Sequence, residues 1–301
     1  MKKVLLTGAT GFIGSHCIAP LIERGYEVNA VTSREPGEGF PGVRWHRCNL
    51  LDLDATAALL RTVRPSHLLH LAWYVVPGKL ISAPENYDWF HASFGLVRQF
   101  CAEGGAKVVS SGSSYEYDWK YGYCSELTTP RNPDTVYGVC KNALYEVLKA
   151  MAESFSVKFS WGRVFFLYGP REHPNRLVSS IIRALLRGEP AKTSHGRQIR
   201  DYLHVQDVAD GLVALLDSDV VGPVNIGSGI PVALREIIQT IGRMLAREDL
   251  VQIGAVPARA NDAPLVVADV RRLTEELQWR QRMDIVSGLE QTIDWWKRHT
   301  D

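Results

Sequence analysis

The stretch VLLTGATGFIGSH, residues 4–16, carries three glycines between an apolar, β-rich run and the helical pattern SHCIAPLIERG. The pyrophosphate of a dinucleotide needs a tight turn, a close approach of the backbone and a helix N-terminus that points at its charge. A strand, a glycine-rich turn and a helix in this order supply all three. The stretch therefore predicts a dinucleotide site formed by Gly8, Gly11, Phe12, Ile13 and Gly14.

The order of elements beyond this stretch predicts an α/β fold. Five β-rich runs alternate with segments long enough for crossover helices: KVLLTG, EVNAVTS, HLLHLAW, KVVSSG and FSWGRVFFLYG. Such alternation is typical of a doubly wound parallel sheet, a Rossmann domain, with its ligand crevice at the carboxyl ends of the strands. After residue 169, loops and amphipathic helices such as RLVSSIIRALLRG and GLEQTIDWWKRH predict a smaller C-terminal substrate-binding lobe.

The same pattern gives an expected division of the chain. We expect an NAD(P)-binding domain over residues 1–168, completed by a returning segment of about 200–226. The substrate-binding lobe then comprises residues 169–199 and 227–301. Because no internal repeat or long linker separates them, the two parts should pack as one unit.

Composition argues against several classes of partner. The chain has 34 Lys and Arg against 33 Asp and Glu, a net charge of +1, which gives no reason to expect nucleic acid or an anionic membrane. No apolar run approaches the roughly 18 residues of a membrane span, and the N-terminus does not have the pattern of a signal peptide. Five scattered cysteines with no C-x-x-C pair are typical of reduced thiols. We therefore expect a cytoplasmic protein without a metal site.

The second β-rich run bears on the choice of cofactor. It ends in Thr32, Ser33 and Arg34, where dinucleotide-binding chains usually place an acid that binds the ribose hydroxyls. An arginine beside a hydroxyl can hold a 2′-phosphate, so NADP(H) is favoured and NAD(H) is the alternative. Arg34 could equally be a solvated surface residue.

The motif Tyr-x-x-x-Lys occurs twice, as Tyr137 with Lys141 and as Tyr145 with Lys149. Four-residue spacing places both side chains on one helix face, where the ammonium can lower the pKa of the phenol. Such a tyrosine is a general acid/base for an alcohol oxygen. We expect Asp134 to cap the helix, which places Tyr137 in its first turn near the crevice. The first pair is therefore predicted to be catalytic, and the second to serve packing and solvation.

With these motifs in place, the chain resembles the extended short-chain dehydrogenase/reductase family of sugar-nucleotide epimerases, dehydratases and reductases. The resemblance covers nearly the whole chain. It implies an NAD(P) domain, a lobe that holds a nucleoside-diphosphate sugar, and a homodimer formed by two helices of each subunit, the tyrosine helix among them. It rests on TGATGFIG, HLLHLAW, YGVCK, RVFFLYGPR, RQIRDYLHVQDVADG, VNIGSG and ADVRRLTEELQW.

Members of this family carry a Ser or Thr beside the tyrosine, and two alignments compete for it here. Matching VVSS at the strand entry places Gly112 at that position and would leave the site incomplete. Matching EYD to the family's VYG places Ser113 there, at a spacing that resembles the epimerases. We prefer Ser113 as the catalytic and substrate-binding serine, with Ser111 and Ser114 as reserves.

The resemblance also implies contacts to both ligands. Arg200 in RDYLHV, and with weaker support Arg259, would bind the substrate diphosphate, because guanidinium groups pair well with phosphate oxygens. His204 is expected to form structural hydrogen bonds. Cofactor contacts would come from Ser33, Arg34, Asn49, Leu50, Leu71, Ala72, Tyr137 and Lys141.

Two departures from the family pattern concern the sugar. Phe166 stands where many members have an Asn that touches the sugar or its phosphate. Ala92 or Ser93 replaces another common Asn. These changes leave the identity of the sugar open.

The residues after Ser113 bear on the reaction. Dehydratases have an Asp–Glu pair there, whereas this chain has Ser114 and Tyr115, so 4,6-dehydration is disfavoured. Glu116, one position later, keeps it as a lesser alternative. We favour NADPH-dependent reduction of a nucleotide-linked 4-keto sugar, with an NAD-dependent epimerase as the close alternative. A non-catalytic NAD(P)-binding protein of the same fold is a further hypothesis.

Overall fold

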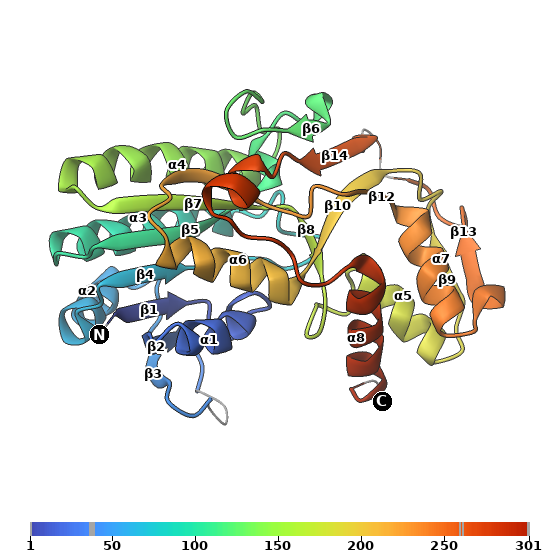
Figure 1. Cartoon of the computed structure of the whole chain (residues 1–301), viewed down its shortest axis with the longest axis horizontal. Helices are drawn as coiled ribbons and strands as arrows, with labels where there is room; N and C mark the ends of the chain where they lie inside the picture. The colour runs from blue at the N-terminus through green and yellow to red at the C-terminus, as the bar shows by residue number, and fades with distance from the viewer. Residues whose placement is uncertain (1, 36–39, 259, 261, 300–301) are drawn as a thin grey trace.

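A computed structural model describes residues 2–35, 40–258, 260 and 262–299. Within these residues, a seven-stranded parallel sheet has the order β11-β7-β5-β4-β1-β2-β3 (Figure 1). This order confirms the predicted doubly wound α/β class. Its strands are β1 (Lys3–Thr7), β2 (Glu27–Thr32), β3 (Arg44–Arg47), β4 (His67–His70), β5 (Lys107–Ser113), β7 (Lys158–Val164) and β11 (Gly222–Ile226).

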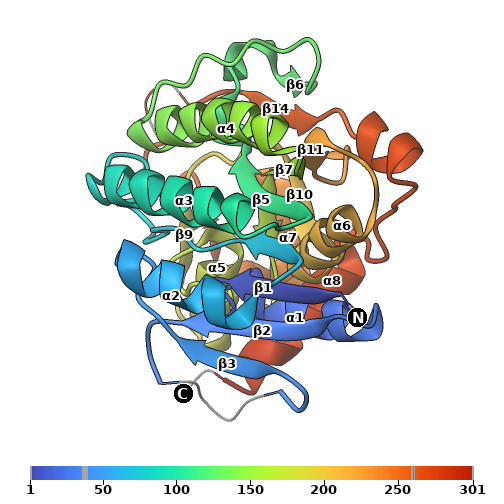
Figure 2. The same ribbon diagram turned by 90° about the vertical axis from the view of Figure 1, so that its left-hand side faces the viewer.

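Helices cover both faces of this sheet, as a view along its edge shows (Figure 2). Helices α1 (Gly14–Glu23) and α6 (Val205–Asp217) lie on one face. The opposite face is covered by α2 (Leu53–Val63), α3 (Glu85–Ala102) and α4 (Val136–Phe155). Because both faces are buried, the central strands are apolar along most of their length, as predicted for a parallel sheet.

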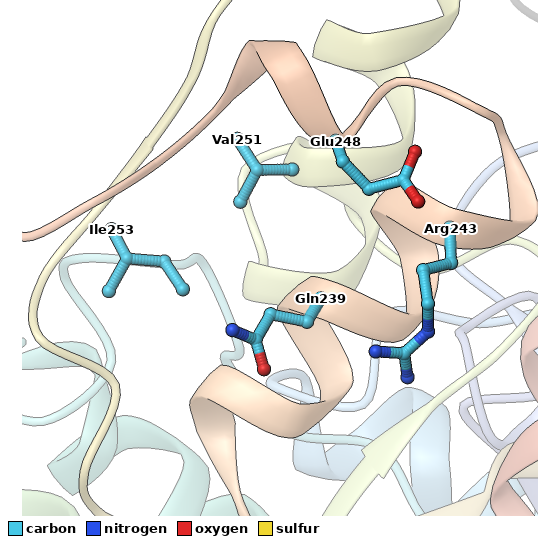
Figure 3. Close-up of a pocket in the computed structure, with 5 residues that line it drawn as sticks. All are labelled: Gln239, Arg243, Glu248, Val251 and Ile253. Carbon is cyan, nitrogen blue, oxygen red and sulfur yellow. The ribbon is translucent and has the colours of Figure 1, made fainter.

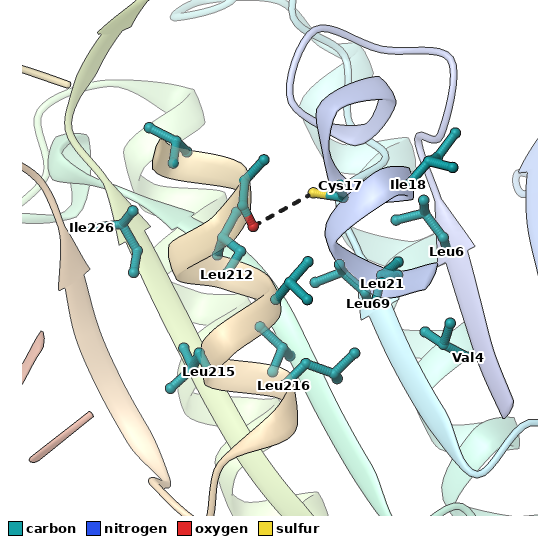
Figure 4. Packing of buried hydrophobic residues seen from close by; sticks show 14 of the residues in the cluster. Val4, Leu6, Cys17, Ile18, Leu21, Leu69, Leu212, Leu215, Leu216 and Ile226 are labelled. Carbon is teal, nitrogen blue, oxygen red and sulfur yellow. Dashed lines mark hydrogen bonds between the residues drawn. The ribbon is translucent and has the colours of Figure 1, made fainter. Parts of the chain in front are cut away.

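Apolar side chains of α1, α6 and the strands beneath them form one buried cluster (Figure 4). Ile18 and Leu21 of α1 and Leu212 of α6 are fully buried with Leu6 and Leu69 of the sheet. The side chains of the two helices interdigitate over the strands, and burying each such residue stabilises the fold by about 1.5–3 kcal/mol.

A smaller second sheet, three helices and a pair of short strands form the rest of the molecule, mostly from the C-terminal half of the chain. The sheet has the order β12-β10-β14-β6, and β8 pairs with β10. Its strands are β6 (Tyr123–Cys124), β8 (Phe166–Tyr168), β10 (Ile199–His204), β12 (Pro231–Ala233) and β14 (Leu265–Ala268). The helices are α5 (Leu177–Leu186), α7 (Leu234–Met244) and α8 (Ile285–Lys297), and β9 (Ala191–Thr193) pairs with β13 (Val251–Ile253).

Three local expectations differ from the structure. The run FSWGRVFFLYG is two strands, because the chain leaves the large sheet at Phe165 and enters the small one. Strand β3 was not predicted, since its sequence RWHR is polar and lies at the sheet edge. The cap of α4 is Thr135, whose hydroxyl accepts from the Gly138 N–H at 3.1 Å, so the expected cap Asp134 is wrong by one residue.

Helices α5 and α8 confirm the two amphipathic segments expected after residue 169. The exact domain boundaries stay a prediction. None of the described helices combines the length and hydropathy of a membrane-spanning segment.

Candidate active site

The glycine loop joins β1 to α1 and has room for no side chain at its two tightest points. Gly8 has φ of +70°, and a Cβ there would lie 2.8 Å from the Ala72 backbone nitrogen. At Gly14, the first residue of α1, a Cβ would lie 2.7 Å from the Gly8 carbonyl carbon. At these positions no side chain covers the backbone at the N-terminus of α1. A pyrophosphate binds to such a surface of backbone N–H groups. Gly11, Phe12 and Ile13 complete the loop, and these residues fit a dinucleotide.

Behind this loop, a buried hydrogen-bond chain ties β1, β4 and α3 together. The Thr7 hydroxyl accepts from the Leu71 and Ala72 N–H groups at 3.1 and 3.3 Å and lies 2.7 Å from His70 Nδ1. The hydroxyl therefore donates to Nδ1, and His70 Nε2–H donates to Ser93 Oγ at 2.8 Å. Burial, with a smaller effect of the Lys141 charge, lowers the pKa of His70 to about 3.

This series of hydrogen bonds places Leu71 and Ala72 directly against the glycine loop. It also joins Ser93, one of the two residues that could stand at the family's Asn position, to His70. The sequence did not reveal these hydrogen bonds, because Thr7 and His70 look like ordinary strand residues.

The second expected cofactor region lies at the end of β2. Ser33 and Arg34 are exposed, and no ion pair of the Arg34 guanidinium occurs within the part of the chain that the structure describes. The Thr32 hydroxyl fixes the turn by accepting from the Arg34 N–H at 3.1 Å. Beyond β3, the Asn49 carbonyl Oδ1 accepts from the Leu51 N–H at 3.2 Å, and Leu50 is buried.

Ser113, Tyr137 and Lys141 come together at the carboxyl end of the sheet. Ser113 is the last residue of β5, and Tyr137 lies in the first turn of α4. Burial raises the pKa of the Tyr137 phenol, and a hydrogen bond with the Ser113 side chain opposes that rise. Lys141 Nζ donates to the Ser111 carbonyl at 2.9 Å, and burial lowers its pKa to about 7.

The geometry of β5 explains the glycine before this serine. A Cβ on Gly112 would collide with Trp161 Nε1 and lie 2.6 Å from a Glu116 carboxylate oxygen. The next residue, Ser113, forms the side-chain hydrogen bond with Tyr137. Gly112 therefore leaves space for a buried group, and the choice of Ser113 as the catalytic serine stays a prediction. Ser114, one of the two reserves, is buried.

Glu116 is the buried group that Gly112 accommodates. Its carboxylate accepts from the Ser113 N–H at 2.8 Å, from Trp161 Nε1 at 2.9 Å and from Arg163 Nε at 2.6 Å. Both Glu116 and Arg163 are fully buried. This carboxylate faces the protein interior and holds the backbone of Ser113, and dehydration stays the lesser alternative.

Trp73, which sequence reasoning did not single out, covers the lysine. Its ring centroid lies 3.8 Å from Lys141 Nζ, and the ring makes an edge contact with Tyr137 at 6.3 Å between centroids. The indole N–H donates to the Asn86 side-chain oxygen at 2.8 Å, which fixes the ring. The only signal in the sequence is a large aromatic residue directly after HLLHLA.

The second tyrosine–lysine pair lies away from this cluster. Tyr145 is buried and packs against Phe159 and Trp161 at centroid distances of 6.2 and 5.8 Å. Lys149 is exposed. This placement agrees with the packing and solvation predicted for the second pair.

Arg200, which was predicted to bind the substrate diphosphate, lies on β10 and already has two partners within the protein. Arg200 Nη2 donates to Asp262 Oδ1 at 2.6 Å, and Nη1 donates to the Ile199 carbonyl at 2.9 Å. Its guanidinium carbon lies 5.3 Å from the Phe166 ring and 5.9 Å from the Trp119 ring. Sequence reasoning missed Asp262.

Two other predicted residues have different outcomes. Arg259 lies outside the described residues. His204 caps α6, where its Nδ1 accepts from the Gln206 N–H at 3.3 Å, and burial lowers its pKa to about 4. This structural hydrogen bond is the one expected of it.

Two further features lie outside the cluster around Tyr137. Among the described residues, no group of three or more His, Cys, Asp or Glu side chains could hold a metal ion. A pocket of about 510 Å³ lies between α7 and β13 (Figure 3). Its lining residues come from these C-terminal elements and include none of the cluster around Tyr137. They are Gln239, Arg243, Glu248, Val251 and Ile253.

Comparison with known proteins adds independent information. The model of the NAD dependent epimerase/dehydratase family matches residues 4–227. The chain is 26% identical over 322 residues to UDP-glucuronic acid decarboxylase 1 of Danio rerio, covering 100% of this chain and 74% of that protein.

Solved structures are similar over the same extent. MoeE5, solved in complex with UDP-glucose and NAD, is 30% identical and covers 99% of each chain, with a TM-score of 0.83. The UDP-glucose 4-epimerase of Thermus thermophilus, solved with NAD, is 25% identical, with a TM-score of 0.88. That match covers 98% of this chain and 99% of the epimerase.

Proposed function

This chain belongs to the NAD dependent epimerase/dehydratase family, and from the geometry of its crevice we propose that it moves a hydride at a hydroxyl-bearing carbon of a nucleoside-diphosphate sugar. The observation that carries the proposal is the convergence of Ser113, Tyr137 and Lys141 beside a glycine loop that fits a dinucleotide. Membership agrees with the resemblance that the sequence motifs indicated.

The protein's own residues handle the proton. When bound, a nicotinamide dinucleotide supplies the hydride acceptor or donor. Tyr137 exchanges a proton with the reacting sugar oxygen, and the Ser113 hydroxyl holds that oxygen beside it. Burial raises the pKa of Tyr137, so its phenolate needs a nearby positive charge. Lys141, one turn further along α4, supplies that charge, and Trp73 and the Ser111 carbonyl hold the ammonium in place.

Epimerisation at carbon 4 with a retained NAD is the first candidate reaction. Relatives support it, since the Thermus thermophilus protein is a UDP-glucose 4-epimerase solved with NAD. MoeE5, at 30% identity, was also solved with NAD and a UDP-sugar. In this reaction the retained NAD takes a hydride from the sugar and returns it to the same sugar, so no second substrate enters the site. A buried group such as Tyr137 can then handle the proton.

Reduction of a 4-keto sugar nucleotide with NADPH is the second candidate, and one observation favours it. The end of β2 presents Ser33 and the exposed guanidinium of Arg34 where an acid would disfavour a 2′-phosphate. This preference for NADPH stays a prediction, because MoeE5 and the Thermus thermophilus epimerase were solved with NAD.

Two further expectations become part of the proposal. The dinucleotide part comprises residues 1–168 and about 200–226, and the sugar-nucleotide part comprises 169–199 and 227–301. A homodimer through α4 is supported by apolar side chains that this helix leaves exposed: Val139, Val147 and Phe155, at 49, 39 and 45%.

One experiment separates the candidates. The purified protein is denatured, and the released nucleotide is identified and counted per chain. Stoichiometric NAD, together with interconversion of UDP-glucose and UDP-galactose or of another UDP-sugar pair, supports the epimerase. A protein that releases no nucleotide on denaturation, and that oxidises NADPH while it reduces a nucleotide-linked 4-keto sugar, supports the reductase. Bound nucleotide without turnover in either assay refutes both and favours a non-catalytic protein.

A further inference from the structure

The ammonium of Lys141 lies beside two indole rings, out of contact with water. Its Nζ atom is 3.8 Å from the centroid of the Trp73 ring and 5.8 Å from that of the Trp161 ring. Lys141 is 2% exposed and Trp73 is 8% exposed. The Ser111 carbonyl accepts from Nζ at 2.9 Å. Because burial opposes the charged form of a lysine, the ammonium needs such contacts to keep its proton.

The titratable groups that act on Lys141 come from three elements packed around it. They are Tyr137 and Cys140 of α4, Glu116 of η1 (Ser114–Glu116) and His70 of β4. At neutral pH the phenol, the thiol and the imidazole are uncharged, because burial raises the pKa of the first two and lowers that of the third. The carboxylate of Glu116 favours the ammonium, but it is already paired with Arg163 of β7 at 2.6 Å.

The Trp73 ring is fixed in its place over the ammonium. Its indole N–H donates to Asn86 Oδ1 at 2.8 Å. The Asn86 amide is oriented in turn, because its Nδ2 donates to the Leu80 and Ala83 carbonyls, each at 2.8 Å. The same indole makes an edge contact with Tyr137, at 6.3 Å between ring centroids. One fixed ring therefore touches both members of the tyrosine–lysine pair.

We propose that Trp73 is a positioning residue of the proposed reaction, and that the face of its ring keeps Lys141 charged beside Tyr137. The proposal rests on the proposed function, because it takes the proton transfer by Tyr137 from it. A ring face suits this place better than an acid. A carboxylate would also favour the ammonium, but its negative charge would oppose the phenolate. A neutral ring leaves the positive charge free to act on the phenol.

The proposal predicts how the site responds to pH. Burial lowers the pKa of Lys141 to about 7, so the ammonium loses its proton close to neutral pH. The cation–π contact favours only the charged form, so its removal lowers this pKa further. Turnover that needs the charge then falls at a lower pH. A role of Trp73 in packing alone would reduce turnover by the same factor at every pH.

Nuclear magnetic resonance of the lysine side chains measures the protonation of Lys141 directly. The protein is labelled with ¹³C at lysine Cε, the signal is assigned with Lys141→Met, and its chemical shift is followed against pH. Trp73→Leu should lower the pKa of Lys141 by about one pH unit, the tenfold change that the loss of a desolvated cation–π contact produces. Trp73→Phe is the matched control, because it also loses the indole N–H but keeps a ring face. It should lower the pKa by about half a pH unit or less.

A fluorinated tryptophan at position 73 tests the same contact with the packing unchanged. Fluorine withdraws electron density from the ring face and leaves the shape and the N–H of the indole nearly as they were. The pKa of Lys141 should decrease as fluorine atoms are added, because the attraction depends on the electron density of the face. This substitution keeps the test decisive if Trp73→Leu does not fold.

Several results would overturn the proposal. They are an unchanged or raised pKa of Lys141 in Trp73→Leu, equal decreases in the Leu and Phe variants, and no response to fluorination. The pH above which turnover falls should also move with the pKa of Lys141, and a pH profile that stays in place would show that Trp73 does not position the lysine for the reaction. The failure of the proposed function looks different. If the wild type turns over none of the sugar nucleotides, that function is wrong, and the titrations alone decide whether Trp73 keeps the ammonium charged.

Discussion

Replacing Glu116 should show how much of the site depends on one buried ion pair. The carboxylate accepts from the Ser113 N–H, Trp161 Nε1 and Arg163 Nε, and the two charged side chains are 0 and 1% exposed. Glu116→Leu leaves the Arg163 charge buried without its partner. Removing one member of such a pair costs about 3–5 kcal/mol.

The loss should be visible as a lower melting temperature. The entropy of unfolding is about 2.1 cal/mol/K per residue, so for 301 residues it is roughly 0.6 kcal/mol/K. A loss of about 4 kcal/mol in the free energy of unfolding then corresponds to a decrease of about 6 °C. Calorimetry and urea unfolding of the wild type and the variant measure both quantities.

A double-mutant cycle identifies the cause of the loss. Glu116→Leu with Arg163→Met removes both charges, and replacing a whole buried pair by apolar groups is often close to neutral. The double variant should therefore be more stable than the Glu116→Leu single variant, with a coupling energy of about 2 kcal/mol or more. Additive losses, or a single-variant loss below about 1 kcal/mol, would refute the reasoning. Activity should fall in both, because the Ser113 backbone loses its acceptor.

The remaining predictions concern the phenol, the buried imidazole and the glycine loop. Tyr137→Phe should lower turnover by about 10²–10⁴-fold while bound nucleotide per chain is unchanged; loss of turnover in Tyr145→Phe instead would mean that the second pair is the catalytic one. Because burial lowers the pKa of His70 to about 3, only the unfolded chain takes up its proton as the pH falls through 6.5. The resulting loss of stability between pH 7 and pH 5, about 2 kcal/mol, should be absent from His70→Asn in urea unfolding, and an equal loss in the variant would contradict the assignment. Gly14→Ala should weaken dinucleotide binding at least about tenfold by calorimetry, because its Cβ would displace the loop backbone. Gly211→Ala in α6, whose Cβ would meet only ordinary contacts of 3.6 Å or more, is its control, and equal affinities in the two variants would count against the loop as the binding surface.

Local sequence was enough to predict the parallel-sheet half of the fold. Strand, glycine turn and helix follow one another without a gap, so their geometry depends on neighbours a few residues apart. The same holds for Tyr137 and Lys141, which lie one helical turn apart. Edge strand β3 was missed because its polar residues lack the apolar pattern of a buried strand.

The contacts around the candidate site join residues that are far apart in sequence. Glu116 meets Arg163 across 47 positions, and the Thr7 hydroxyl meets His70 across 63. No local pattern shows that a glycine at 112 makes room for that carboxylate.

For the candidate site, the sequence by itself determined the glycine loop, the tyrosine–lysine pair and the serine-rich strand end, because each is encoded within one or two adjacent elements. Only the tertiary structure decided which way Ser113 and Glu116 face. It also decided that Trp73 covers the lysine and that Asn86 fixes its ring. The physical reason is that the direction of a side chain and the residues that cover it depend on how strands and helices pack. That packing is decided by burial of the whole core and not by any one segment.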